Sequence, residues 1–163
     1  MSDILAQYGR VTIYNEPNHP SPIYHVEGTI EANPYGDLAA LLEDDSLEEV
    51  MYNGGTQCVK VAHRDHGMCR TNVWIDDNDG LQIATNIASF TNVPLGDGPG
   101  MVPIFDGRLP DGSRVNGTIP PVSPDGPTLT IRKFKEDPLT MIDLINFGTV
   151  NLRLCLLYTS DAA

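Results

Sequence analysis

Proline and glycine are concentrated in one stretch of the chain, and this stretch constrains the fold more than any other feature. Residues 94–127 contain 8 prolines and 7 glycines among 34 residues. Proline breaks a helix interior, and within a sheet it is confined to edge strands, strand ends and bulges. We therefore expect no helix here. The short apolar runs at 101–105, 114–119 and 128–134 are predicted to be edge strands joined by turns, and the last of them alternates most regularly.

The remaining chain shows both helical and strand patterns. Leucines 38, 41, 42 and 47 predict a helix over 36–44, and apolar residues between 81 and 90 predict a second helix capped within 76–79. A third helix is expected to start at Asp137-Pro138 and to stop at Gly148. These patterns predict an α+β fold: a mostly antiparallel sheet with two or three helices packed on it, preceded by a short N-terminal arm. Further strands are predicted over 11–14, 23–27, 50–52, 58–64 and 68–75, the last two as a hairpin.

Charge is distributed unevenly along the chain. The net charge is −12, which argues against a nucleic-acid-binding surface, so no nucleic-acid partner is expected. Residues 1–100 hold 15 acidic and 4 basic residues, whereas residues 101–135 hold 3 acidic and 5 basic residues. The acidic part is typical of a solvated surface, but the basic cluster needs its own explanation. The chain has three cysteines, an odd number that indicates a reducing compartment and no disulfide framework. It has no apolar run long enough to span a membrane, and its first residues lack the basic segment that begins a signal peptide. We therefore expect a soluble, cytoplasmic protein.

Two short motifs that suggest chemistry are rejected on physical grounds. Cys58, His63, His66 and Cys69 are zinc-ligand types at close spacing. Residues an odd number apart in a regular strand point to opposite faces, so Cys58 and His63 diverge and no metal site is expected. The glycine-rich run at 96–100 lacks the lysine and Ser/Thr of a G-x-x-x-x-G-K-[ST] nucleotide loop, a pattern found nowhere in the chain.

The basic cluster is the remaining chemical signal. Arg108 and Arg114 flank the turn at 109–113, which can bring them together, whereas the neighbours Arg132 and Lys133 point to opposite faces of a strand. Clustered guanidinium groups suit phosphate-like anions through forked hydrogen bonds. From the residues alone, surface pairing and protection of a strand edge explain these side chains equally well.

Several segments together resemble a known family. DGRLPDGSRVN at 106–116, IPP at 119–121, DGPTLTIRKF at 125–134, DPLT at 137–140, DLI at 143–145 and FGT at 147–149 are similar to the N-terminal domain of type II/type IV secretion ATPases. Within that family, the archaeal pilus and archaellum motor ATPases and the tight-adherence pilus ATPases are most alike. The resemblance covers about 34–150, is highly specific over 106–149, and has low specificity for the first 33 residues.

The resemblance implies a hexameric motor on the inner face of the cytoplasmic membrane that drives pilus assembly or protein secretion. In such proteins, ATP with Mg²⁺ lies between this N-terminal domain and a RecA-like domain, and N-domain arginines reach the nucleotide phosphates. By position these residues are Arg108, Arg114 and Arg132, with Lys133 as a weaker candidate. Implied partners are the protein's own RecA-like domain, neighbouring subunits of a homohexamer and a membrane platform protein. Without a Walker A motif, this chain is expected to be inactive as an ATPase alone.

The resemblance also suggests where the domain ends. We expect an N-terminal arm over 1–33, the secretion-ATPase N-terminal domain over 34–147, and the start of a linker to a missing RecA-like domain over 148–154. Residues 155–163 resemble a translated sequencing adapter and are predicted to be a non-native tail. The alternative interpretation of the whole chain is a stand-alone acidic module that binds protein partners and has no nucleotide role.

Overall fold

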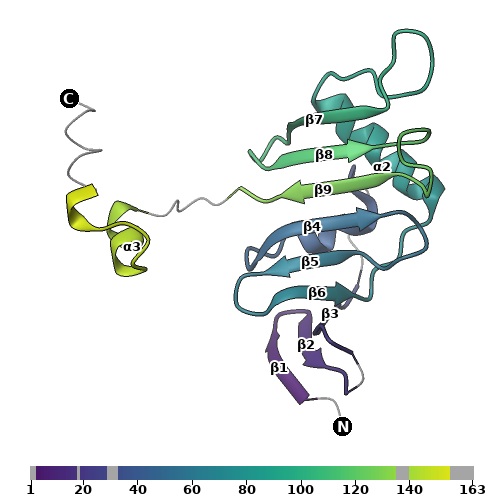
Figure 1. Ribbon diagram of the computed structural model, residues 1–163. Coiled ribbons are helices and arrows are strands. Elements are labelled where there is room, and N and C mark those ends of the chain that lie inside the picture. Colours follow the sequence, from purple (N-terminus) through teal and green to yellow (C-terminus); the bar gives the residue numbers. More distant parts are fainter. Residues whose placement is uncertain (1–2, 18, 29–32, 135–139, 155–163) are drawn as a thin grey trace.

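A computed structural model of the protein describes residues 3–17, 19–28, 33–134 and 140–154 (Figure 1). Within these residues nine strands form a single sheet, in the order β1-β2-β3-β6-β5-β4-β9-β8-β7. Neighbouring strands are antiparallel except for β3 and β6, which are parallel. The predicted α+β class with a mostly antiparallel sheet is therefore confirmed. The strands are β1 (Asp3–Tyr8), β2 (Val11–Asn15), β3 (Ile23–Val26), β4 (Leu47–Asn53), β5 (Lys60–His63), β6 (Gly67–Thr71), β7 (Ile104–Arg108), β8 (Arg114–Thr118) and β9 (Thr128–Arg132).

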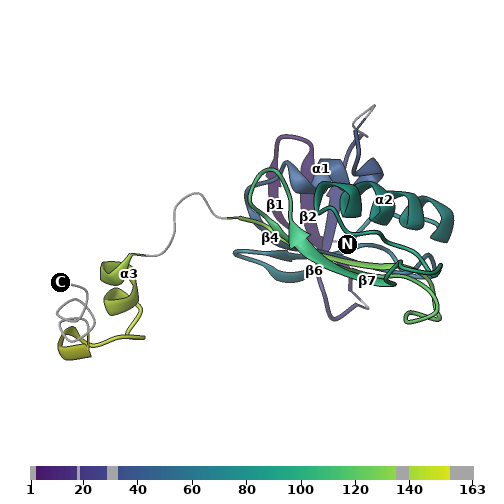
Figure 2. The same ribbon diagram turned by 90° about the horizontal axis from the view of Figure 1, so that it is seen from above.

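Two helices cover one face of the sheet and leave the other face open (Figure 2). A 3-10 turn, η1 (Gly36–Leu38), leads into the short helix α1 (Ala39–Leu42), and α2 (Asp77–Phe90) is the longer helix. Helix α2 begins where predicted, because the Asp76 carboxylate accepts the backbone N–H groups of Asn78 and Asp79, each at 2.9 Å. The first predicted helix is too long: α1 ends at Leu42, and Leu47 begins β4.

Strand alternation sets which side chains face the helices. In β9, Leu129 and Ile131 are buried in the same apolar cluster as the α2 residues Ile83 and Ile87. Thr128, Thr130 and Arg132 therefore point to the opposite, helix-free face, because successive strand residues alternate.

The expectation of edge strands after residue 100 is wrong for two of the three strands. β9 pairs with β4 on one side and β8 on the other, and β8 lies between β9 and β7, so only β7 is an edge. The physical reason is the placement of the prolines. All of them lie between the strands, so each strand keeps the backbone N–H groups that an interior position requires.

The first strand, β1, is not predicted by the sequence pattern, and it is attached to the body of the fold by a polar cluster around Tyr8. The Tyr8 hydroxyl lies 2.7 Å from Ser46 Oγ, 2.9 Å from Asp44 Oδ2 and 3.1 Å from His63 Nε2. The hydroxyl of Tyr24 donates to the same Asp44 carboxylate. Hydrogen bonds from β1, β3, β5 and the loop before β4 thus hold the N-terminal hairpin on the sheet.

The third helix, α3 (Met141–Asn146), follows at the end of the chain (Figure 1). Thr140 caps it reciprocally with Asp143, and Gly148 ends it in the left-handed conformation with φ of +72°, as predicted. Its predicted start at Asp137-Pro138 and the predicted tail at 155–163 lie outside the described residues. None of the helices in the described segments combines the length and apolar character that crossing a membrane demands.

Candidate anion-binding site

Three of the four basic residues singled out in the sequence lie side by side on the open face of the sheet. Arg108 of β7 is the register partner of Arg114 of β8, and Arg114 is in turn the partner of Arg132 of β9. All three side chains are exposed. Register partners in antiparallel strands have Cα atoms about 5 Å apart, so this arginine row spans about 10 Å across three strands.

Acidic residues lie near the arginine row, but none of the described ones forms an ion pair with it. Among the residues that the structure describes, none of the three guanidinium groups makes a hydrogen bond or an ion pair. Glu49 of β4 is the next register partner beyond Arg132, but its carboxylate does not pair with that arginine. Like charges directly opposite one another destabilise a sheet, so this row carries an energetic cost that an anion would relieve.

A shallow hollow adjoins two of the arginines. It has a volume of about 260 Å³ and is lined by Asp106, Gly107, Arg108 and Arg114. Asp106 and Asn116 are register partners on the same face, one step along the strands from the arginine row. Gly107 contributes backbone to this lining, since a Cβ there would point to the helix-covered face, toward Thr91. A phosphate-sized anion can therefore approach the two guanidinium groups, which can donate forked hydrogen bonds to it.

Lys133 does not join the row. Its side chain points to the other face, as the alternation of the strand predicts, and is largely buried. The ammonium group donates to the Asp44 backbone carbonyl at 2.6 Å and lies 3.8 Å from the Asp45 carboxylate. Burial lowers the pKa of Lys133, while Asp45 and Asp44 act in the opposite sense. A phosphate contact of Lys133 stays a prediction, and its place in the fold makes it an anchor between β9 and the loop before β4.

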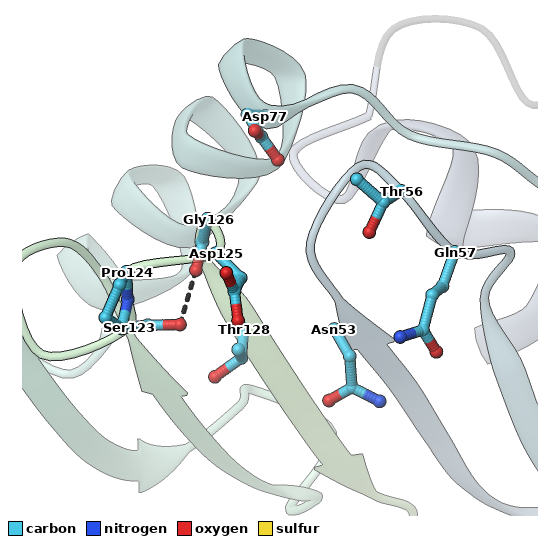
Figure 3. A pocket seen from close by; sticks show the side chains of 9 residues that line it. All are labelled: Asn53, Thr56, Gln57, Asp77, Ser123, Pro124, Asp125, Gly126 and Thr128. Atoms are coloured by element: carbon cyan, nitrogen blue, oxygen red, sulfur yellow. Dashed lines mark hydrogen bonds between the residues drawn. The ribbon is translucent and has the colours of Figure 1, made fainter.

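A larger cavity of about 530 Å³ lies at the opposite end of β9 (Figure 3). Its lining contains amides, hydroxyls and two carboxylates but no basic side chain, so it has no attraction for an anion. One of these carboxylates, that of Asp77, also accepts the backbone N–H of Gly55 at 2.7 Å. The residues that line this cavity are Asn53, Thr56, Gln57, Asp77, Ser123, Pro124, Asp125, Gly126 and Thr128.

Two of the four residues considered as zinc ligands, His63 and Cys69, contact backbone groups of the β5–β6 hairpin. His63 accepts the backbone N–H groups of Asp65 and His66 on Nδ1, at 3.1 and 3.3 Å. Cys69 is buried and contacts the Gly67 carbonyl at 3.6 Å through its sulfur. Within the described parts of the chain, no group of three or more His, Cys, Asp or Glu side chains is arranged to hold a metal ion.

Curated relatives of the chain come from Methanocaldococcus jannaschii, whereas no protein-family model matches. The uncharacterized protein MJ0781 is 50% identical over 117 residues, which are 72% of this chain and 16% of that protein. The uncharacterized protein MJ0900 is 37% identical over 131 residues, which are 76% of this chain and 23% of that protein. MJ1288, also uncharacterized, is 34% identical over 88 residues, 52% of this chain and 33% of that protein. The chain thus spans between 16% and 33% of the length of these relatives.

A solved structure shares the fold of this chain. It is the VirB11 ATPase from the Brucella suis type IV secretion system, determined in complex with sulphate. The superposed region covers 71% of this chain and 33% of the VirB11 chain. The TM-score is 0.55 and the sequence identity 23%. The chain has the fold of one part of a type IV secretion ATPase. At this identity the match shows a shared fold, and the function has to be argued from the site itself.

The local sequence pattern anticipated part of this site. It placed Arg108 and Arg114 at the two ends of a turn, and the strand register confirms that they are partners. It also placed the side chains of Arg132 and Lys133 on opposite faces of the sheet. It did not place Arg132 beside Arg114, because that requires β9 to return next to β8 after the proline-rich connection at 119–127. It also missed Ser113, a buried hydroxyl behind the row, for which the motif holds no chemical signal.

Proposed function

We propose that this chain is the N-terminal domain of a secretion or pilus-assembly ATPase, and that Arg108, Arg114 and Arg132 contact the phosphates of ATP. The observation that supports this is the arginine row, exposed and without ion pairs among the described residues. The fold shared with part of the VirB11 ATPase and the greater length of the M. jannaschii relatives are consistent with a further domain on the same protein.

The chemistry of phosphoryl transfer suits such a row. Charge develops on the phosphate oxygens in the transition state, and positioned arginines stabilise it electrostatically. The open face of a sheet forms only one wall around a nucleotide, so the opposite wall has to come from another domain. We expect a RecA-like domain to hold ATP and its Mg²⁺, because the chain carries no G-x-x-x-x-G-K-[ST] motif.

The remaining parts of the proposal follow from the family resemblance. The full protein would be a homohexamer at the inner face of the cytoplasmic membrane. It would couple ATP turnover to the assembly of pilus or archaellum-like filaments, or to protein secretion, through a membrane platform protein. The domain described here would close over the nucleotide and pass its movement on to that partner.

Anion binding by the chain itself tests the proposed phosphate contacts. We expect inorganic tripolyphosphate, titrated into the ¹⁵N-labelled chain at low salt, to shift backbone and arginine Nε–Hε NMR signals of the row. Arg114→Ala should weaken this binding about tenfold, because one charge-assisted contact is lost. The control is Arg64→Ala, which makes the same charge change at an arginine outside the row.

Two outcomes would contradict the proposal. Equal effects of Arg114→Ala and Arg64→Ala would indicate that only the net charge matters. No perturbation of the row by tripolyphosphate, together with tight binding of a partner protein without nucleotide, would favour the acidic interaction module. In a longer protein that carries the RecA-like domain, Arg114→Ala or Arg132→Ala should lower ATP turnover at least about tenfold.

A further inference from the structure

The position of the arginine row depends on the turn between β7 and β8. The Leu109 N–H donates to the Ser113 carbonyl at 2.8 Å, and the Gly112 N–H donates to the Leu109 carbonyl at 2.9 Å. Gly112 has φ of +89°, a conformation that favours glycine. A Cβ at Gly112 would also lie 3.3 Å from the ring of Phe134, so the turn packs closely against the end of β9.

One hydroxyl group connects this turn to β9. Ser113 is 1% exposed, and its Oγ donates to the Asp111 carboxylate at 2.6 Å. The same oxygen accepts the backbone N–H of Phe134 at 3.0 Å, and the Ser113 N–H donates to Asp111 at 3.1 Å. Phe134 lies two residues after Arg132, and Ser113 lies one residue before Arg114. The hydrogen bond between Phe134 and Ser113 therefore joins the two chain segments next to these arginines.

On its other side, the segment after β9 is connected to β4 and to the loop before β4. Next to Phe134, the backbone N–H of Lys133 donates to the Glu48 carbonyl at 2.9 Å, and the Lys133 ammonium group donates to the Asp44 carbonyl. Beyond β9 the chain is therefore held toward β4 by Lys133 and toward the β7–β8 turn by Ser113. The register of β8 and β9 ends at the pair Arg114 and Arg132, and the Ser113 bond extends the connection one residue past that pair.

We propose that Ser113 is a positioning residue for the arginine row, an inference that rests on the proposed phosphate contacts. Strand pairing aligns the three arginines, and the Ser113 hydroxyl holds the turn that follows Arg108 and precedes Arg114 against the residues after β9. The last register pair of β8 and β9 is thereby kept from fraying, so that the three guanidinium groups converge on one anion. Without the hydroxyl, the Phe134 N–H and the Asp111 carboxylate lose their common partner, and the turn can move away from β9. Displacement of a charged donor by about 1 Å is enough to weaken a bound geometry that depends on several contacts.

The test uses the full 163-residue chain with inorganic tripolyphosphate as the probe. We expect Ser113→Ala to weaken binding about tenfold in an NMR titration, comparable to the loss of one arginine contact. Ser113→Thr, which keeps the hydroxyl, should restore most of the affinity. The matched control is Ser123→Ala, which removes a turn hydroxyl bond to the Gly126 carbonyl at the opposite end of β9 (Figure 3).

Each outcome decides the inference. Weaker binding in Ser113→Ala, unchanged binding in Ser123→Ala and a shifted Phe134 amide signal support the positioning role. An equal loss in both serine variants would indicate general destabilisation and would overturn it. Unchanged binding in Ser113→Ala, while Arg114→Ala still loses affinity, would overturn the role of Ser113 and leave the proposed phosphate contacts intact.

The folding of the variant is controlled independently. If Ser113→Ala does not unfold cooperatively, Asp111→Ala takes its place, because it removes the acceptor in the turn but keeps the bond between Ser113 and Phe134. Because Asp111→Ala also removes a negative charge, which favours anion binding, its affinity is compared with that of Asp125→Ala, which makes the same charge change at the opposite end of β9. We then expect an affinity about threefold lower than in Asp125→Ala, since the turn loses one of its hydrogen bonds to Ser113. Equal affinity in the two variants would contradict the inference. If both Asp111→Ala and Arg114→Ala kept full affinity, this result would instead refute the phosphate contacts themselves.

Discussion

At the scale of single residues, His63 gives the fold a pH dependence. Its Nδ1 accepts two backbone N–H groups, so in the folded state this nitrogen carries no proton and the ring is neutral. Burial lowers the pKa of His63, with His66 and Arg64 acting in the same sense and Asp44 and Asp65 opposing it. As pH falls below the unfolded value of about 6.5, the unfolded chain takes up a proton that the folded chain does not, so stability is lost. The urea midpoint should therefore be lower at about pH 5.5 than at about pH 7.5.

His63→Gln is the control for this prediction, because it removes the titrating ring. Its urea midpoint should change less between the two pH values, and an equal change in both proteins would contradict the role of His63. The Asp44 carboxyl does not titrate between about pH 5.5 and about pH 7.5. Burial alone would raise the pKa of that carboxyl, but hydrogen bonds from Ser46 and Tyr24 hold it below its usual value. The stability that Asp44 contributes is present above a pH of about 4 and is lost only below it.

At the scale of elements, Gly117 allows the strands that carry the arginines to pack. It lies in β8 between Phe105 and Leu129, and a Cβ there would come within 2.3 Å of the Phe105 ring. Gly117→Ala should therefore destabilise the fold by about 1–3 kcal/mol through overpacking, measured as a lower urea midpoint. Gly98→Ala is the matched control, because a Cβ at Gly98 meets only Met101 at ordinary contact distance. Equal midpoints for the two variants would contradict this account of β8.

Some of the helices and strands could be predicted from the sequence and others could not. Strand β9 was predictable, because Leu129 and Ile131 alternate with polar residues, and helix α2 was predictable from its cap at Asp76. β1 was missed because the adjacent Ile4 and Leu5 break the alternation that identifies a half-buried strand. The order of the strands in the sheet could not be predicted in this way. The alternation within a strand determines which side chains face the core, but not which strands lie next to it. The arginine row is a product of that order, so only two of its members could be placed together in advance.

At the scale of the whole molecule, the arginine row is a small basic region on a chain with a net charge of −12. Self-repulsion of the acidic residues destabilises the folded state, so moderate sodium chloride should raise the urea midpoint by screening alone. Tripolyphosphate at matched ionic strength should raise it further, because binding to the folded state adds about 1.4 kcal/mol at ten times Kd. Arg114→Ala should keep the effect of sodium chloride and lose most of the additional effect of tripolyphosphate. If the two salts stabilise the unaltered chain equally at matched ionic strength, then the row binds no anion specifically and its three charges act only through the overall field of the molecule.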